Sequence, residues 1–481
     1  MNWQNQLSRF AAVLVLVMAC NKASALEPLE VGFAAVDITP QLSATRDIWL
    51  AGYLPGRKAT GVHDPLFART VVLFDGTQTI ALTSVDLVGI QFPIVQRVRK
   101  RLPDIDYVLV SSTHSHEGPD TIGLWGPTYV QRGVDDDYLK QVEDGIVNSI
   151  EQATKNKQPA LASYGIADNE ALLRDNRLPV VKDPTLRLLK FTSPTSKRNI
   201  GLLVQWNCHP EAMGAANTKI TADFCAATIA ALEKKHQCSV AYFTGAIGGL
   251  LAPPAKLLSE SGEELRDGNL PFTWRYGELV AEVATKAVAN AVPVQLTPFE
   301  ISHRSIAIPV RNPVYRTARI LGVLRRESIR WRGDYESIGP QVTITSALKT
   351  TAIETEVGYL ALGEVHVAAI PGELFPELVY GNFQSPIDPG ADYPNAAREP
   401  TIEQIMPSDK WLLFGLANDE IGYIIPKSQW DSNPPYAYGR DKPQYGEINA
   451  CAVDAAPIVM DALAKRVLDV TNRSDSRTTT K

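Results

Sequence analysis

The sequence predicts an α/β or α+β fold, and two observations support this prediction. Short apolar runs typical of buried strands recur along the chain, at residues 71–76, 79–90, 106–112, 200–206, 239–245 and 364–370. Segments with the apolar spacing of amphipathic helices lie between or after these runs, at residues 222–236, 272–292 and 453–470. Such alternation is typical of sheets packed with helices rather than of β-sandwiches or helix bundles.

The N-terminus has the pattern of an export signal over residues 1–25. A weakly basic start precedes an apolar run at residues 10–19, and small residues at positions 23–25 suit a cleavage site. This run is too short to cross a bilayer as a helix. It ends in a sequence like a bacterial lipoprotein box, apart from the bulky Met18. We therefore expect export to the periplasm or the medium, with lipid attachment at Cys20 as the alternative.

The remaining sequence is expected to form one large catalytic-type domain over residues 26–471, followed by a flexible polar tail at residues 472–481. Apolar residues make up 45% of the chain and charged residues 21%, which argues against disorder and coiled coil. A net charge of -6 without a basic cluster argues against nucleic acid as a partner. The cysteines after Cys20 form no CxxC pair, so disulfides and buried free thiols both remain open.

Two histidines end the strand-like run in VLVSSTHSHEGPD, residues 108–120. In an extended chain, residues two apart point to the same side, so His114 and His116 can address one point. Neutral imidazole is the commonest metal ligand in proteins, and a pair with this spacing suits a metal site. A hydrogen-bonded polar loop is the alternative.

Polar residues also follow other strand-like runs. His209 comes after residues 200–206, Glu373 comes after residues 364–370, and residues 415–423 offer acids and a tyrosine. In α/β proteins, ligand-handling residues commonly lie at such strand ends. Two histidines and a carboxylate would leave an open position for water, as in catalytic zinc sites. Taken singly, His209 also suits a structural role and Glu373 a helix N-terminus.

Several familiar catalytic motifs are missing from the sequence. It contains no GxSxG, GxxxxGK[ST], HExxH or GxGxxG pattern in a suitable context. A serine hydrolase or a nucleotide-binding enzyme is therefore not expected.

A series of motifs runs through nearly all of the chain after residue 25, and THSH and PGE are its most specific members. The motifs are VGFAAVDITP (31–40), GY (52–53), GVHDPL (61–66), STHSHEGPD (112–120), DNR (175–177), NCHP (207–210), TGAIGG (244–249), PGE (371–373) and GLANDEIGY (415–423). In this order they resemble the catalytic domain of the neutral/alkaline non-lysosomal ceramidases, zinc amidases that split the N-acyl bond of ceramide. The resemblance implies layered β-sheets flanked by helices, with Zn²⁺ as the cofactor.

The resemblance also implies a set of metal ligands. It makes His114, His209, Glu373 and Tyr423 the protein ligands of the zinc, within the motifs THSH, NCHP, PGE and GLANDEIGY. We further expect a carboxylate to orient the ligand histidines. Asp86 and Asp223 are the candidates, with capping and turn roles as the alternative.

Catalytic roles follow from the same resemblance. His116 would lie beside the metal and contact the substrate or the developing oxyanion, and Arg177 would line the same site. His116, Arg177 or Tyr423 would stabilise the oxyanion. His116 is also the expected proton donor to the leaving amine.

Two departures from the family pattern affect the expected substrate. Where the family carries GDVSPN, residues 245–250 are GAIGGL, which puts Gly248 in place of an active-site serine. If the missing serine limits the choice of substrate, Gly248→Ser should restore ceramide cleavage. The family also continues into a C-terminal immunoglobulin-like domain that this sequence does not include.

These features lead to three functional hypotheses. The first is a zinc-dependent, ceramidase-like hydrolase of linear amide bonds that acts on ceramide, a sphingolipid, or a related N-acyl compound. The second is a zinc hydrolase of the same fold that acts on a non-sphingolipid amide, an ester or a lactone. The third is a non-catalytic binding homologue. The expected partner is a small-molecule or lipid N-acyl substrate, reached through peripheral contact with a membrane.

Overall fold

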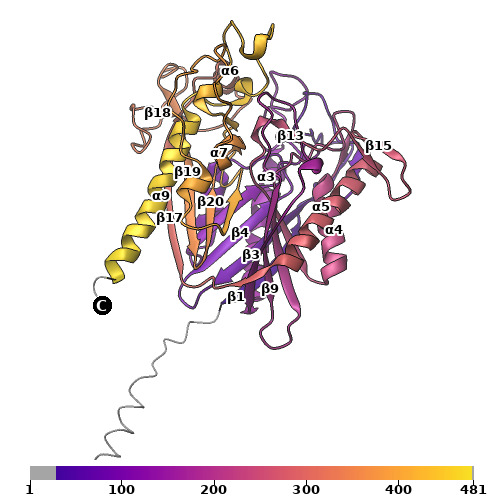
Figure 1. Cartoon of the computed structure of the whole chain (residues 1–481). Helices are drawn as coiled ribbons and strands as arrows, with labels where there is room; N and C mark the ends of the chain where they lie inside the picture. Colours follow the sequence, from indigo (N-terminus) through magenta and orange to yellow (C-terminus); the bar gives the residue numbers. More distant parts are fainter. Residues whose placement is uncertain (1–28, 479–481) are drawn as a thin grey trace, which may run out of the picture.

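A computed structural model describes residues 29–478 of the chain, with side chains described as far as Arg473 (Figure 1). The expected export signal at residues 1–25 and Cys20 lie outside the described residues. Helix α9 (Ala455–Thr478) extends into the segment 472–481 that was expected to be a flexible tail. The last three residues of that segment are also outside the described part.

Three five-stranded sheets make up most of the β structure in residues 29–478. The first has the order β5 (Tyr107–Ser112), β4 (Thr79–Val85), β3 (Phe67–Phe74), β1 (Glu30–Asp37) and β6 (Gln158–Pro159). The second has the order β12 (Ser239–Thr244), β10 (Asn199–Trp206), β9 (Thr185–Thr192), β7 (Leu161–Asp168) and β16 (Val292–Val294). The third contains β17 (Phe299–Pro309), β19 (Thr351–Leu362), β20 (Val365–Ala369) and β22 (Trp411–Phe414), with β18 (Ile329–Arg330) paired to β19. Each predicted strand run overlaps one of these strands, although residues 86–90 of the run 79–90 lie beyond the end of β4.

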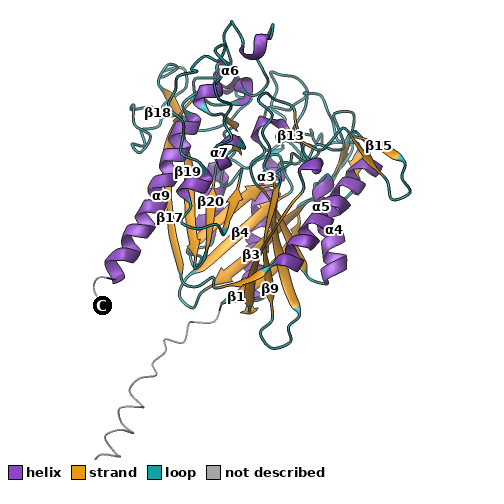
Figure 2. Cartoon of the chain, viewed as in Figure 1, coloured by secondary structure: helices purple, strands orange, loops and turns teal. Residues whose placement is uncertain are grey.

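The three sheets share one apolar core, and the long helices cover it from outside (Figure 2). Leu82 of the first sheet, Leu203 of the second and Leu360 of the third belong to the same buried cluster. Strands buried on both faces read as continuous apolar runs, which explains why the sequence pattern was clear. The predicted mixed α/β fold is therefore confirmed.

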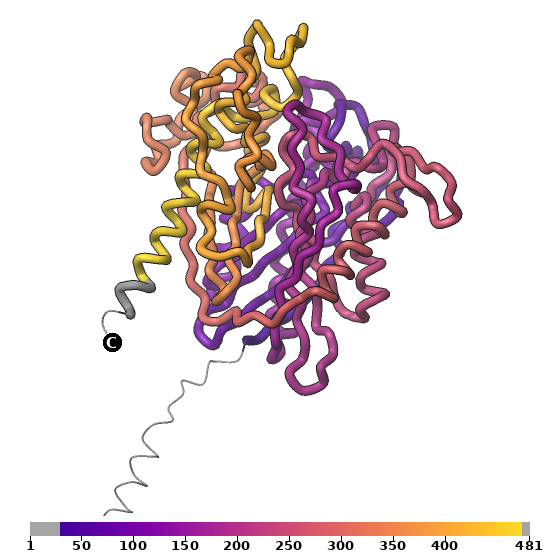
Figure 3. Tube along the Cα trace, viewed as in Figure 1, coloured from indigo at the N-terminus to yellow at the C-terminus, as the bar shows by residue number. Residues whose placement is uncertain are grey.

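Two helices pack on each of the first two sheets, and one long helix packs on the third. Helices α2 (Phe92–Arg101) and α3 (Asp136–Lys155) pack on the first sheet, and α4 (Phe224–His236) and α5 (Leu270–Asn290) pack on the second. Helix α9 packs on β17 and β19 of the third sheet. Figure 3 shows this C-terminal part, in orange to yellow, forming one side of the molecule.

Shorter elements lie mainly around the loops that join the sheets. The short strand pairs are β2 (Gly61–Val62) with β11 (Lys219–Ile220), β8 (Arg174–Asp175) with β13 (Leu251–Ala252), β14 (Lys256–Leu258) with β15 (Glu264–Arg266), and β21 (Glu373–Leu374) with β23 (Tyr423–Ile424). The short helices are α6 (Pro313–Ile320), α7 (Glu377–Tyr380) and α8 (Ile402–Ile405). Across residues 29–478, none of the helices combines the length and apolar character needed to span a membrane.

The carboxyl ends of neighbouring strands from all three sheets meet at one place. Strands β4 and β5, β10 and β12, and β20 and β22 are parallel pairs, so their ends point the same way within each sheet. The Thr244 hydroxyl donates to the Thr113 carbonyl at 2.7 Å, and the Gly415 amide donates to the Thr244 carbonyl at 2.8 Å. These bonds join the three sheets close to the strand end that His114 follows.

The cysteines of the described part are all free thiols. Cys208, Cys225 and Cys451 are buried, and Cys238 is partly exposed. Of the two alternatives left open by the sequence, the structure therefore favours free thiols.

Candidate metal centre

His114 lies in the turn that follows strand β5, with a left-handed backbone at φ 70°. Its amide donates to the Leu87 carbonyl at 2.9 Å, and its ring Nδ1 lies 2.6 Å from the Val88 carbonyl. Because a carbonyl can only accept, Nδ1 carries the ring proton and Nε2 is left with a free lone pair. A strained backbone held by neighbouring bonds is typical of functional sites.

His209 is fixed in the same way at the end of strand β10. Its amide donates to the Leu251 carbonyl at 2.8 Å, and its Nδ1 lies 2.9 Å from the same oxygen. The Nε2 atom therefore points away from Leu251, with its lone pair available for a ligand.

Glu373 and Tyr423 face His209 from the short parallel strands β21 and β23, where they are register partners. The Oε2 atom of Glu373 lies 2.9 Å from His209 Nε2 and 3.7 Å from His114 Nε2. The Tyr423 hydroxyl lies 3.5 Å from His209 Nε2. Ligand atoms of a tetrahedral zinc ion lie about 3.3 Å apart, so these four groups have the spacing of one coordination shell.

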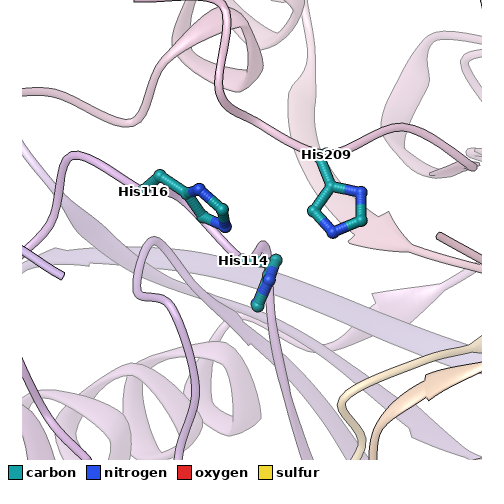
Figure 4. Close-up of side chains that lie close together, drawn as sticks. All are labelled: His114, His116 and His209. Carbon is teal, nitrogen blue, oxygen red and sulfur yellow. The ribbon is translucent and has the colours of Figure 1, made fainter. Parts of the chain in front are cut away.

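His116 lies beside these groups, and Figure 4 shows its ring with those of His114 and His209 around a common point. One ligand atom from each of the three rings lies within 4.8 Å of the others. The His116 ring packs edge-on against Tyr53 at 5.1 Å. Its Nδ1 has no hydrogen-bond partner among the described residues and is 3.7 Å from Glu211 Oε2. His116 is therefore placed to contact a substrate or to act as an additional ligand.

Burial favours the neutral form of His114 and His116. It lowers the pKa of His114 to about 4, although Glu373 acts in the opposite direction. Burial and the neighbouring His114 lower the pKa of His116 well below its usual value. Burial also lowers the pKa of His209, but hydrogen bonding to Glu373 outweighs this and the net shift is upward. Neutral imidazoles beside a carboxylate are the form that binds a metal cation.

The donor set fits a divalent cation. His209 already donates its Nδ1 proton to a carbonyl, and yet its Nε2 lies 2.9 Å from Glu373 Oε2. Two electron-rich atoms at this distance need a positive charge between them, either a shared proton or a metal ion. Because His114 Nε2 and the Tyr423 hydroxyl converge on the same place, a metal ion satisfies more of the donors than one proton can.

Arg177 does not join this group. Its guanidinium forms an ion pair with Glu447 at 2.7 Å and donates to the carbonyls of Gln429 and Tyr445. It also lies over the ring of Phe375, 5.4 Å from the ring centroid. The connection of Arg177 to the site is thus indirect, through Tyr445 and Phe375, and its catalytic role stays a prediction.

The expected carboxylate partners of the ligand histidines are replaced by backbone carbonyls. Asp223 accepts from the amides of Ala212, Met213 and Phe224 and caps helix α4, while Asp86 accepts from the Phe67 amide. The capping and turn roles are therefore the correct ones. Val88 and Leu251 orient His114 and His209 through main-chain oxygens, which no side-chain pattern in the sequence could reveal.

The histidine group opens into a cavity with about 810 Å³ of space free of atoms, including its opening to solvent. His114, His116, Glu373 and Tyr423 line one part of it. Other parts of the wall are apolar and come from Ile122, Leu124, Val310, Leu324 and Ile353. Sequence reasoning missed the contribution of residues 310–326, because no motif or long apolar run marks these positions.

Gly248 is packed too closely to be replaced by serine. A Cβ atom at this position would lie 2.5 Å from the Phe375 ring and 2.7 Å from the Leu374 carbonyl carbon. A serine at position 248 would therefore require the main chain of β21 to move. The loop 245–250 is thus built around small residues.

Comparisons with known proteins point to one family. Residues 29–252 match the family described as neutral/alkaline non-lysosomal ceramidase, N-terminal. A neutral ceramidase of Pseudomonas aeruginosa is 24% identical over 263 residues, which cover 49% of this chain and 38% of that protein. The chain thus matches less than half of the length of this relative.

The fold matches solved structures over a larger part of the chain. A crystal structure of neutral ceramidase from Pseudomonas aeruginosa matches with a TM-score of 0.68 at 16% identity, over 93% of this chain and 75% of that chain. A ceramidase complexed with C2 matches with a TM-score of 0.66 at 15% identity, over 93% of this chain and 76% of that chain. Together with the family match, these findings confirm the resemblance predicted from the sequence.

Proposed function

Because residues 29–252 match the N-terminal domain of the neutral/alkaline non-lysosomal ceramidases, we propose that the protein is a zinc-dependent hydrolase of linear N-acyl amide bonds. The observation that carries this proposal is the convergence of His114, His209, Glu373 and Tyr423 at the wall of a largely apolar cavity. Their donor atoms come from separate strand ends. Glu373 Oε2 lies 2.9 Å from His209 Nε2 and 3.7 Å from His114 Nε2, and the Tyr423 hydroxyl lies 3.5 Å from His209 Nε2.

The choice of zinc is supported by the chemistry of the donors. Two imidazole nitrogens with a carboxylate oxygen form a common catalytic zinc set, and the Tyr423 phenol would add a fourth oxygen. Magnesium and calcium prefer shells made entirely of oxygen, which this site does not offer. A zinc ion bound here supplies an activated water and polarises the acyl carbonyl of the substrate.

The chain's own residues would supply orientation and protons. The carbonyls of Val88 and Leu251 hold the two ligand rings with Nε2 toward the site. His116 has a ring nitrogen without a hydrogen-bond partner among the described residues, so it can donate to the substrate oxygen or to the leaving amine. The Tyr423 hydroxyl lies 3.5 Å from His209 Nε2 and can stabilise the negative charge that develops on the acyl oxygen.

The apolar wall supports an acyl substrate. Ile122, Leu324 and Ile353 would contact a hydrocarbon chain, while the polar groups would hold its amide end. Ceramide or a related N-acyl lipid is the first candidate. The close packing of Gly248 favours the second candidate, a non-sphingolipid amide or ester, because this site cannot hold the serine of the family pattern.

A substrate panel with metal analysis tests the proposal. The purified protein should contain about one zinc per chain and should release fatty acid from at least one N-acyl compound among ceramides, N-acyl amino acids, simple amides and esters. His114→Ala and His209→Ala should abolish both zinc content and turnover. His63→Ala, at an exposed histidine outside the site, is the matched control. A protein that binds N-acyl lipids but hydrolyses none would instead be the non-catalytic homologue.

Export to the periplasm or the medium remains part of the proposal, supported by the pattern of residues 1–25. Cell fractionation tests it, with the N-terminal sequence of the mature protein showing whether cleavage follows Ala25 or precedes Cys20. Protein retained in the cytoplasm with residues 1–25 intact would contradict it.

A further inference from the structure

Arg319 is a buried cation in the wall of the cavity. It lies on helix α6, which begins at Pro313 after the capping residue Asn312. The buried face of this helix contains Ala318 and Arg319, whereas Val314 and Ile320 are exposed. Only 8% of Arg319 is exposed, although arginine is rarely buried unless it is paired.

The guanidinium of Arg319 lacks a counterion in the described part of the chain. Its Nη2 donates to the Ser328 hydroxyl and to the carbonyls of Arg326 and Glu327. Its Nε and Nη1 have no hydrogen-bond partner among the described residues. The bonds that do form are to neutral oxygens, so they leave its positive charge uncompensated.

A second arginine in the cavity wall does have a counterion. Arg326 also lines the cavity, but both of its terminal nitrogens bind the carboxylate of Asp419. Asp419 is thereby occupied, and the charge of Arg326 repels that of Arg319. Burial and this repulsion lower the pKa of Arg319 to about 10, which still leaves it protonated at neutral pH.

A buried charge without a partner is costly to the folded protein. A hydrophobic side chain would suit this position better, because Leu324, Val310 and Ile353 line the same cavity. An uncompensated cation in the wall of a binding cavity is best explained by a ligand that brings the missing negative charge.

We propose that Arg319 binds an anionic group of the substrate, so that the preferred substrates are N-acyl compounds carrying a carboxylate rather than neutral ceramides. This inference rests on the proposed N-acyl hydrolase function and names its substrate class. An N-acyl amino acid combines the required features: an apolar chain for the cavity wall, an amide for the histidine group, and a carboxylate for Arg319.

A matched pair of substrates tests the inference. N-lauroylglycine and N-lauroylethanolamine have the same acyl chain and amide, and differ in a carboxylate against a hydroxymethyl group. The wild-type protein should show a kcat/KM at least about tenfold higher for N-lauroylglycine than for N-lauroylethanolamine. The reason is that a hydrogen bond to a charged group typically strengthens binding by about tenfold or more. Arg319→Met should remove this preference, and Arg319→Lys should keep part of it.

Arg325→Met is the matched control, because Arg325 is 65% exposed and does not line the cavity. It should keep the wild-type ratio of the two kcat/KM values. A kcat/KM ratio near one in the wild-type protein, or a ratio that Arg319→Met leaves unchanged, would overturn the inference. Hydrolysis of both compounds would still support the proposed function in that case.

Binding without turnover separates the two proposals. In protein treated with a chelator, N-lauroylglycine should raise the melting temperature of the wild type more than N-lauroylethanolamine does, and Arg319→Met should lose the difference. This result would support the anionic subsite even if neither compound is hydrolysed, which would count against the proposed function. If lauric acid alone shows the Arg319-dependent shift and N-lauroylglycine does not, the assignment to the substrate carboxylate is wrong. Arg319→Gln serves the same measurement if Arg319→Met does not fold.

Discussion

The Oε2 atom of Glu373 lies 2.9 Å from Nε2 of His209, a nitrogen whose ring partner Nδ1 already donates to the Leu251 carbonyl. The two residues are 164 positions apart in the chain. His209 follows β10 of the second five-stranded sheet, and Glu373 begins β21 of a separate two-stranded sheet. Such a contact between two lone-pair donors defines the position of a positive charge in the site.

Glu373→Gln should weaken metal binding strongly. The amide keeps the size of the side chain but loses the negative charge that attracts a cation. Loss of an outer partner of a metal ligand already costs about 10- to 100-fold in affinity, so loss of a direct ligand should cost at least about 100-fold. Competition with a chelating dye measures the change. Glu364→Gln, at a half-exposed side chain away from the site, should bind metal like the wild type.

Tyr423→Phe should reduce turnover more than metal content. The phenyl ring keeps the packing against Phe375, while the hydroxyl near His209 is lost. Removal of one stabilising donor to an oxyanion typically costs about 100-fold in kcat. Zinc content and kcat should be measured on the same preparation. Tyr445→Phe, in the same cavity wall, provides the comparison, and equal effects of the two changes would count against a special role for Tyr423.

Gly248→Ser should destabilise the protein without creating ceramidase activity. The new side chain would collide with the backbone of Leu374 and the ring of Phe375. Overpacking of this kind typically costs about 1–3 kcal/mol. The unfolding free energy of Gly248→Ser in urea should be compared with that of Gly61→Ser. At position 61 the atoms nearest to the new Cβ would belong to the flexible Lys219 side chain, at 3.7 Å. A stable Gly248→Ser protein with new ceramide cleavage would show that β21 can shift, contrary to this account.

Ionised Glu356 should stabilise the folded protein, and this stabilisation should be lost in acid. Burial alone would raise the pKa of this carboxyl, but hydrogen bonds from Arg99 and His303 lower it to about 2, below its ordinary value of 4.5. The folded state therefore binds fewer protons than the unfolded state between these two values. The stabilisation is fully present above pH 4.5 and is lost as the pH falls toward 2, by about 3 kcal/mol in total.

Urea unfolding of the wild type and of Glu356→Gln at several pH values between 6 and 3 measures this contribution. The difference in unfolding free energy between the two proteins should shrink as the pH falls. A constant difference over this range would mean that Glu356 titrates normally.

Much of the fold was predictable because several of its strands are buried on both faces. Runs such as residues 106–112 and 200–206 are apolar throughout, and they became β5 and β10. Strand β19 was not predicted from its pattern. It contains Glu356, which interrupts the apolar run and is compatible with burial only because Arg99 and His303 reach it from distant parts of the chain.

The site was predictable to a similar degree and for a related reason. His114, His209 and Glu373 follow apolar strands, so the position of each next to a strand end was visible in the sequence, and the family resemblance added Tyr423. The orienting groups were not visible, because Val88 and Leu251 act through main-chain oxygens and not through their side chains. Arg319 was also missed, since its lack of a counterion is a property of its three-dimensional neighbours alone.

The most direct test of the central claim is a crystal of the full chain, grown with zinc, with diffraction recorded on both sides of the zinc absorption edge. The account predicts one strong anomalous peak within about 2.0–2.3 Å of His114 Nε2, His209 Nε2 and a Glu373 oxygen, with the Tyr423 hydroxyl close to it. No peak at this position in protein that hydrolyses an N-acyl substrate would contradict the account.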